Sequence, residues 1–136
     1  MYLIDTNIIS ELCSRRPNFG VVRWSQGVSE FLLSAVTVEE VSYGLALQPN
    51  ARLSSWFDKF FNGPTQILAI TKEIAQQSGT LRGALGRSGI ARTQADLFIA
   101  ATAIIHNLTL VTRNVKDFKG LPLTVLNPFR DKSSSI

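Results

Sequence analysis

Short apolar runs alternate along the chain with longer segments whose apolar residues recur at the roughly 3.6-residue period of a helix. Turn-forming residues separate the two kinds of segment, as at 62–64 and 86–89. The pattern predicts strands at residues 2–4, 31–36, 66–70, 108–112 and 123–126. It predicts helices at residues 7–12, 37–47, 52–61, 71–85 and 93–105.

Strands that alternate with helices indicate an α/β fold, in which a mostly parallel five-stranded sheet carries helices on both faces in three layers. The 136 residues contain no internal repeat or linker and suffice to bury about two thirds of the unfolded chain's surface. We therefore predict one domain, residues 1–132, followed by a disordered tail at residues 133–136.

Four acidic residues fall where this fold would bring them together. Asp5 ends the first apolar run, Asp117 follows a late strand, and Glu40 and Asp96 are predicted in first helical turns. Strand carboxyl ends and helix N-termini share one edge of a parallel sheet, so we expect the four carboxylates to meet there. Clustered carboxylates repel one another unless a cation joins them, which predicts a site for Mg²⁺ or Mn²⁺.

Each acid also has a structural explanation when it is taken alone. Residues 37–40 fit a capping box, in which Glu40 would reach back to the cap's backbone N–H, and Asp96 has a looser relation of this kind to Thr93. Asp117 fits a solvated turn. Asp5 is harder to explain in this way, because it ends an apolar run where an unpaired buried charge is costly.

The net charge of +4 understates how basic the rest of the surface is. If four of the ten Asp and Glu residues bind metal, six acids remain against fourteen Lys and Arg residues, and the rest of the molecule carries a net charge of +8. That excess favours a polyanionic partner such as nucleic acid, although a basic protein kept soluble by its charge would look the same.

Other residues narrow the range of chemistry and location. The single Cys13 and the single His106 can form neither an internal disulfide nor a zinc site with Cys/His spacing, and His106 is predicted to be a surface residue. The longest apolar stretch, residues 97–105, is too short to span a bilayer. We predict a soluble protein of the reducing cytoplasm, without a membrane partner.

Four segments together carry a resemblance to a known family. They are YLIDTN at 2–7, LSAVTVEEV at 33–41 followed by Gly44, ADLFIAATA at 95–103, and LVTRN at 110–114 followed by Asp117 and Phe118. In this order, over essentially the whole chain, they resemble a PIN domain. More narrowly, they are similar to the VapC and FitB-like toxins of bacterial toxin–antitoxin pairs.

The resemblance implies that Asp5, Glu40 and Asp96 are metal-site acids. Family members place a fourth acid at the position of Asn114 or near Asp117, and we assign it to Asp117 because residue 114 is an amide here. The small polar residues at 6 and 7 match residues that support the first acid. The predicted supporting residues are Thr6, Asn7, Thr112 and Asn114.

The same resemblance implies an endoribonuclease that depends on Mg²⁺ or Mn²⁺, forms homodimers, cleaves RNA with metal-activated water and is held in check by a cognate antitoxin. An alternative is a non-catalytic module that binds nucleic acid or protein on this fold. Two enzyme-like rivals fit less well. A phospho-acceptor receiver needs an acid after its central strand, where 66–70 leads into Thr71, and a haloacid-dehalogenase-type phosphatase needs an aspartate where Asn7 stands.

Aromatic residues are concentrated in the predicted helix at residues 52–61. Core packing is the default explanation for a stripe of this kind, but its width also allows a groove for a partner helix. The predicted partner-binding residues are Trp56, Phe57 and Phe60.

Overall fold

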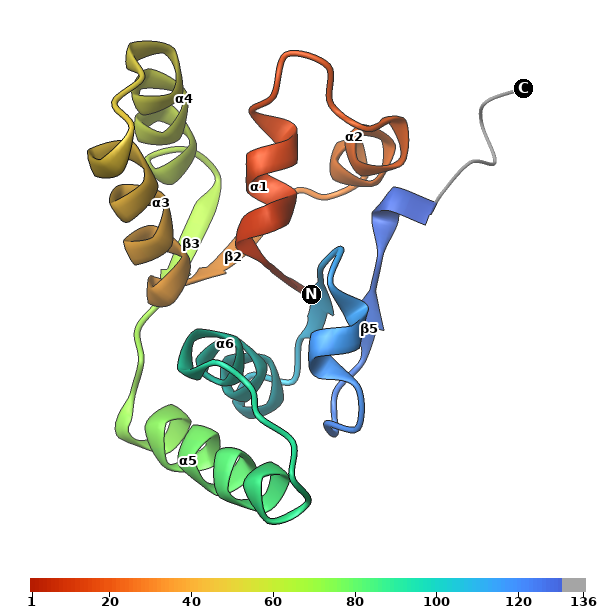
Figure 1. Cartoon of the computed structure of the whole chain (residues 1–136). Coiled ribbons are helices and arrows are strands. Elements are labelled where there is room, and N and C mark those ends of the chain that lie inside the picture. The colour runs from red at the N-terminus through yellow and green to blue at the C-terminus, as the bar shows by residue number, and fades with distance from the viewer. Residues whose placement is uncertain (131–136) are drawn as a thin grey trace.

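Five short strands form one sheet in the computed structural model, which describes residues 1–130 (Figure 1). They are β1 (Tyr2–Ile4), β2 (Phe31–Ser34), β3 (Thr65–Leu68), β4 (Thr109–Val111) and β5 (Val125–Leu126). The order is β3-β2-β1-β4-β5, and every neighbouring pair is parallel. The last residues of β1 and β4, Ile4 and Val111, are register partners, so the chain leaves both strands at neighbouring points of one edge.

Helices cover both faces of this sheet (Figure 1). The α-helices are α1 (Thr6–Leu12), α2 (Phe19–Gln26), α3 (Ala35–Leu47), α4 (Ala51–Phe61), α5 (Lys72–Arg87) and α6 (Gln94–Ile105). Two 3₁₀ helices follow, η1 (Val115–Phe118) and η2 (Pro128–Arg130). The first four α-helices lie on one side of the sheet, whereas α6 lies on the other with α5 packed against it. The predicted three-layer α/β fold is confirmed, with a sheet that is parallel throughout.

Successive strand residues alternate between two hydrophobic cores, one on each face of the sheet. Ile4 and Val111 pack with buried residues of α1, α2, α3 and α4, whereas Leu3 and Leu110 pack against α6. Burying a side chain of this size contributes about 1.5–3 kcal/mol. Because strand side chains point alternately to the two faces, both cores fix the register and thereby the place where each strand ends.

The start of α3 differs from the sequence-based prediction. Ser34, the last residue of β2, caps the helix by accepting a 3.1 Å hydrogen bond from the backbone N–H of Val36. Thr37 is therefore inside the helix and fully buried, and its predicted role as the cap was wrong. Glu40 lies beyond the first helical turn, so the capping box is excluded as an explanation for this acid.

Helix α2 was not predicted. Gly20 in its first turn and the β-branched Val21 and Val22 lower its helix propensity. The helix forms because Asn18 caps it, accepting a 3.2 Å hydrogen bond from the N–H of Val21, and because Glu11 accepts a 2.7 Å bond from the N–H of Asn18. The Asn18 cap was the available local signal.

The described residues contain no helix that is long and apolar enough to cross a membrane. The predicted tail at residues 133–136 and the last two residues of the predicted domain lie outside the described part of the chain.

Candidate active site

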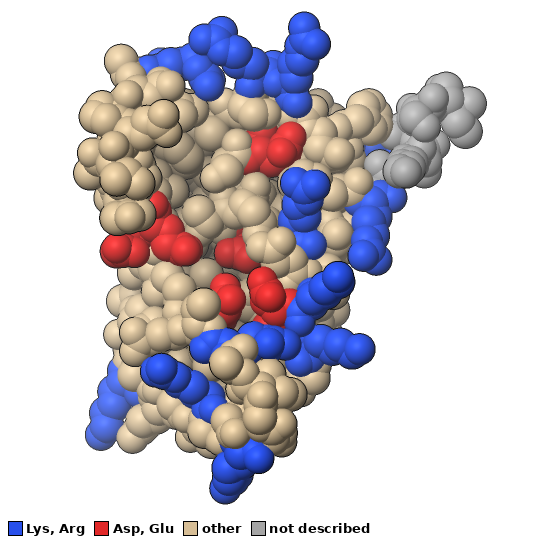
Figure 2. Space-filling model, viewed as in Figure 1, with Lys and Arg blue, Asp and Glu red and all other residues tan. Residues whose placement is uncertain are grey.

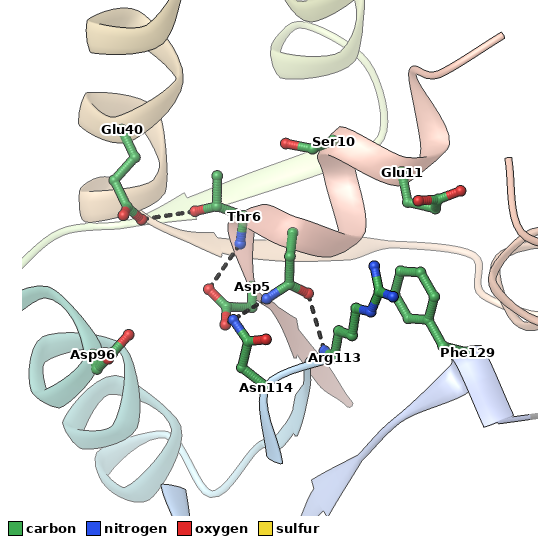
Figure 3. A pocket seen from close by; sticks show the side chains of 10 residues that line it. Asp5, Thr6, Ser10, Glu11, Glu40, Asp96, Arg113, Asn114 and Phe129 are labelled. Carbon is green, nitrogen blue, oxygen red and sulfur yellow. Dashed lines mark hydrogen bonds between the residues drawn. The ribbon is translucent and has the colours of Figure 1, made fainter. Parts of the chain in front are cut away.

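A cavity of about 490 Å³ lies at the sheet edge where β1 and β4 end, and we call it the acidic cavity (Figure 3). Figure 2 shows acidic side chains gathered around a hollow on this face. Three of the four predicted acids line it, each from a different element: Asp5 after β1, Glu40 on α3 and Asp96 on α6. The complete lining is Asp5, Thr6, Asn7, Ser10, Glu11, Glu40, Asp96, Arg113, Asn114 and Phe129.

Asp5 is the most buried of these acids, with 6 % of its surface exposed. Its Oδ1 accepts a 2.8 Å hydrogen bond from the backbone N–H of Thr6, which makes Asp5 the N-cap of α1. Its Oδ2 accepts hydrogen bonds from the hydroxyl of Thr112 at 2.8 Å and from Nδ2 of Asn7 at 3.2 Å. These three donors leave part of the carboxylate's acceptor capacity unused and hold its orientation.

Thr112 and Asn7 also fix the loop that follows β4. The Thr112 hydroxyl accepts a 3.0 Å bond from the backbone N–H of Asn114, and Oδ1 of Asn7 accepts a 3.0 Å bond from the N–H of Arg113. Nδ2 of Asn7 lies 3.1 Å from the Thr112 hydroxyl. One polar network therefore orients Asp5 and places residues 113 and 114 at the cavity wall.

Glu40 is oriented by Thr6, the residue that follows Asp5. The Thr6 hydroxyl donates a 2.7 Å hydrogen bond to Oε1 of Glu40. The buried hydroxyl of Thr37 lies 3.3 Å from the Thr6 hydroxyl. The close-up shows this bond between α1 and α3 (Figure 3). Thr6 therefore links two cavity acids, since its backbone N–H binds Asp5 and its side chain binds Glu40.

Asp96 occupies the first turn of α6, as predicted. Thr93 caps this helix by accepting a 3.1 Å hydrogen bond from the backbone N–H of Asp96. The Asp96 side chain is half-buried and reaches the acidic cavity from the side of the sheet opposite to α3 (Figure 3). The predicted cap is present, and it presents the carboxylate to the cavity.

Burial raises the pKa of both aspartates above the ordinary value of 3.8. For Asp5, loss of hydration is the main cause; hydrogen bonds from Thr112 and Thr6 oppose it, and the charges of Asp96 and Glu40 add to it. For Asp96, burial again raises the pKa most, and the charge of Asp117 raises it further, whereas Thr93 and Arg92 lower it. The charges of Asp96 and Glu40 thus act on Asp5, and the charge of Asp117 acts on Asp96.

Asp117 and Asn114 occupy different places. Asp117 lies on η1 and lines a neighbouring cavity of about 300 Å³, not the acidic cavity. Asn114 lines both cavities. Three of the four predicted acids thus line one cavity, whereas Asp117 lies at the adjacent cavity, from which its charge raises the pKa of Asp96.

The donor set suits a divalent cation, although it is not preassembled. Buried carboxylates whose charges raise one another's pKa are stabilised by a cation, and carboxylate oxygen is the ligand that Mg²⁺ and Mn²⁺ prefer. Within residues 1–130, however, no three Asp, Glu, His or Cys side chains are close enough together to hold one ion. The three predicted acids line the cavity from different elements, and Mg²⁺ is commonly held by one or two carboxylates together with water.

The sequence-based reasoning missed four residues that line the acidic cavity: Ser10, Glu11, Arg113 and Phe129. The guanidinium of Arg113 lies 4.8 Å from the centre of the Phe129 ring, and both side chains form one wall (Figure 3). Arg113 lies between Thr112 and Asn114 in the sequence, which was a usable signal. Phe129 gave none, because only the tertiary fold brings η2 to this edge.

Cys13, His106 and the aromatic residues of α4 do not line the acidic cavity. Cys13 is buried and His106 is exposed at the end of α6. Phe57 is buried in the core, whereas Trp56 and Phe60 are half-buried, with stacked rings 5.0 Å apart. Phe57 also lines a groove of about 210 Å³ between α1, α3 and α4, which shares Thr6, Ser10 and Glu40 with the acidic cavity.

Comparison with known proteins gives consistent matches over nearly the whole chain. The PIN domain family matches residues 2–122. VapC ribonuclease Y4jK of Sinorhizobium fredii is 31 % identical, over 95 % of this chain and 98 % of the relative. Toxin FitB of Neisseria gonorrhoeae is 35 % identical, over 96 % of this chain and the full length of the relative.

Solved structures match in the same way. The crystal structure of FitAcB from Neisseria gonorrhoeae superposes with a TM-score of 0.82 at 32 % identity, covering 96 % of this chain and all of that one. A toxin–antitoxin complex from Klebsiella pneumoniae gives 0.75 at 29 % identity, covering 94 % and 98 %. The sheet, the cavity acids and these matches agree: the chain belongs to the PIN domain family, among relatives named as VapC and FitB toxins.

Proposed function

We propose that this chain is a divalent-metal-dependent endoribonuclease and the toxin of a toxin–antitoxin pair. The observation that carries the nuclease proposal is the position of Asp5, a buried carboxylate whose pKa is raised by burial and by the neighbouring charges of Asp96 and Glu40. Such a group is stabilised by a cation, and a cation among carboxylates is suited to phosphodiester hydrolysis. The name of the ribonuclease relative from Sinorhizobium fredii supports RNA as the substrate.

Each residue has a distinct role in this proposal. Asp5, Glu40 and Asp96 would hold Mg²⁺ or Mn²⁺, with Asp117 as the fourth acid. When bound, such an ion supplies Lewis-acid stabilisation of charge on the phosphate and lowers the pKa of a coordinated water. The predicted supporting residues orient the acids or border the cavity; they are Thr6, Asn7, Thr112 and Asn114.

No protein nucleophile is needed for this reaction. Cys13 and His106 lie away from the acidic cavity, and Ser10, which lines it, is exposed without a His beside it in the lining. Water is therefore the attacking group in the proposal, and the chain's acids position it by holding the ion.

The toxin proposal is supported by the names of the relatives, one called a toxin and one solved as a toxin–antitoxin complex. The chain also offers surfaces for an inhibitor. The groove between α1, α3 and α4 has an apolar floor and opens beside Glu40, so a bound helix could place a basic side chain at the acids. Trp56 and Phe60 border a further surface hollow with Lys59.

The nuclease proposal is tested by incubating the purified protein with single-stranded RNA, with and without Mg²⁺ or Mn²⁺. We expect cleavage that EDTA abolishes and that Asp5→Asn or Asp96→Asn removes without loss of the fold. Asp58→Asn is the matched control, because Asp58 is an exposed acid of α4. Cleavage at the wild-type rate by both cavity variants contradicts the proposal.

The toxin proposal needs a separate experiment in cells. Expression of the chain should arrest growth, and co-expression of the small protein encoded beside it should relieve the arrest and yield a stable complex. Trp56→Ala and Phe60→Ala should weaken that complex. A chain that is harmless alone and copurifies with no small protein is not a toxin, even if it cleaves RNA. Sedimentation of the isolated chain tests the proposed homodimer.

One observation favours the alternative of a non-catalytic binding module: within residues 1–130, the cavity acids are not preassembled around one point. Calorimetric titration with Mn²⁺ separates the two proposals. The nuclease requires specific binding that Asp5→Asn weakens, whereas the module requires none at any of these acids.

A further inference from the structure

A second cavity adjoins the acidic cavity and has the opposite character. It has a volume of about 300 Å³, and we call it the basic cavity. Arg113 and Asn114 line both cavities, so the two lie side by side along the loop that follows β4. On the face shown in Figure 2, Lys and Arg side chains flank the acidic hollow. The basic cavity is lined by Arg113, Asn114, Val115, Lys116, Asp117 and Arg130.

Its three cationic side chains are exposed and lack an anionic partner among the described residues. Within residues 1–130, none of the three cationic groups forms a hydrogen bond or an ion pair, and the Arg113 guanidinium lies over the Phe129 ring. Asp117 lies in the same lining without pairing with any of them. The cavity therefore keeps a local excess of positive charge available for a ligand.

The backbone that carries two of these cations, Arg113 and Lys116, is fixed beside the acidic cavity. Asn7 accepts a hydrogen bond from the N–H of Arg113, and Arg92 donates from Nε to the carbonyl of Asp117 at 3.0 Å and from Nη2 to that of Lys116 at 3.4 Å. These bonds hold η1 between the α5–α6 loop and the end of β1. The backbone of Arg113 and Lys116 thus keeps a constant position relative to the acidic cavity.

We propose that the basic cavity binds the phosphate next to the one at the cavity acids, so that it positions a single RNA strand across the active site. The inference rests on the proposed ribonuclease function. An RNA strand carries a phosphate at every nucleotide, and cations at one side of the reactive position both attract the strand and set its register. Arg113, which stands between the two cavities, directs the strand from one to the other.

The test removes the cations from the basic cavity and leaves the acids unchanged. Lys116→Gln/Arg130→Gln is compared with Lys72→Gln/Arg87→Gln, which removes two exposed cations of α5 that line neither cavity. Both pairs are made in the Asp5→Asn background, without metal, and binding of a fluorescent single-stranded RNA is measured by anisotropy. Thermal melting verifies that each variant is folded.

We expect the basic-cavity pair to bind RNA about tenfold more weakly at low salt. The slope of log Kd against log salt concentration should fall by about 0.7 for each phosphate that the variant no longer neutralises. The α5 pair should bind like its parent. Equal RNA binding by the two pairs, or no RNA binding by the parent, overturns the proposal. The same binding assay is repeated with an acidic peptide in place of RNA. If the basic-cavity pair loses affinity for the peptide but not for RNA, the proposal is overturned and the cavity is assigned to a protein partner.

Cleavage assays distinguish this proposal from the proposed function. With an otherwise wild-type active site, the basic-cavity pair should raise KM for a long RNA severalfold with little change in kcat, and should cleave a dinucleotide, which has a single phosphate, as wild type does. If the wild-type chain cleaves no RNA with any metal, the proposed function fails, while the binding measurements still decide the role of the basic cavity. If dinucleotide cleavage falls equally, the cations act in the chemistry and the positioning proposal is wrong.

Discussion

The hydroxyl of Thr112 donates a 2.8 Å hydrogen bond to Oδ2 of Asp5, a residue 107 positions away in the chain. The contact exists because β1 and β4 are parallel neighbours that end in register. The same hydroxyl accepts a hydrogen bond from the backbone N–H of Asn114. Thr112 therefore connects the buried Asp5 carboxylate to the loop that leads to the basic cavity.

Thr112→Val removes this hydroxyl while keeping a β-branched side chain of similar size. We expect about 1–2 kcal/mol of destabilisation, because the buried Asp5 carboxylate loses a donor and the partly buried N–H of Asn114 loses its acceptor. Since this bond lowers the pKa of Asp5, its removal should move the acid limb of the pH–rate profile to higher pH. Urea denaturation and the pH profile measure the two effects. Thr112→Ser is the control, and its stability and pH–rate profile should stay near those of wild type.

The raised pKa values of Asp5 and Asp96 predict an unusual pH dependence of stability without metal. Both groups bind protons more tightly in the folded state, so they favour folding below the unfolded pKa of about 3.8 and lose that contribution as pH rises through the folded values. Asp5→Asn should therefore gain stability over wild type at pH 7, and the gain should vanish below about pH 4. Thermal melts in EDTA across this range measure it. A gain that is constant with pH contradicts the assigned cause.

Thr6→Val tests whether the link between Asp5 and Glu40 matters for the proposed metal site. The substitution removes the 2.7 Å bond to Oε1 of Glu40 and leaves the backbone N–H that binds Asp5. We expect Mn²⁺ affinity to fall about tenfold, because Glu40 is no longer held in a fixed orientation, with an effect similar in size to removal of an outer-shell partner. Calorimetry measures the affinity, and Thr6→Ser should restore it. Unchanged affinity would show that the bond from Thr6 to Glu40 does not affect metal binding.

The fold, and the meeting of Asp5, Glu40 and Asp96 at one cavity, could be predicted from the sequence for a physical reason. Strand alternation and helix periodicity are local, and the chain order of a parallel α/β fold then places strand ends on one edge. Asp5 and Asp96 could be located because each follows such a signal directly, a strand end in one case and the Thr93 cap in the other.

The remaining features depend on tertiary contacts that the local pattern does not encode. Ser34 and Thr37 are both capable caps, and only the end of β2 decides that Ser34 is used. Phe129 reaches the cavity through the packing of η2, and Glu11 of α1 supports the start of α2 by accepting a hydrogen bond from the N–H of Asn18. Local sequence reasoning fails where several residues could fill the same structural role, such as a helix cap, and tertiary contacts decide which of them does.

Arg92 is predicted to hold η1 in place. Its guanidinium donates to the backbone carbonyls of Ala91, Lys116 and Asp117, which fixes the loop carrying the fourth acid. Arg92→Lys keeps the charge but cannot reproduce this planar set of donors. We expect about 1–2 kcal/mol of destabilisation and faster amide exchange confined to η1. Hydrogen exchange resolved by segment measures it, and protection of η1 equal to wild type would show that these hydrogen bonds are dispensable.

The identity of the fourth acid is the last prediction. Asp117 is the proposed group because its charge already raises the pKa of Asp96, so the two carboxylates interact electrostatically, whereas Asn114 borders the acidic cavity with a neutral amide. Asp117→Asn should therefore reduce metal-dependent cleavage more than Asn114→Ala, and it should lower the pKa of Asp96 because a neighbouring negative charge is removed. Cleavage rates and NMR titration of the Asp96 carboxyl measure the two effects separately. If Asn114→Ala is the more damaging change while the pKa of Asp96 still falls in Asp117→Asn, Asp117 only tunes the site, and the amide of Asn114 fills the fourth position.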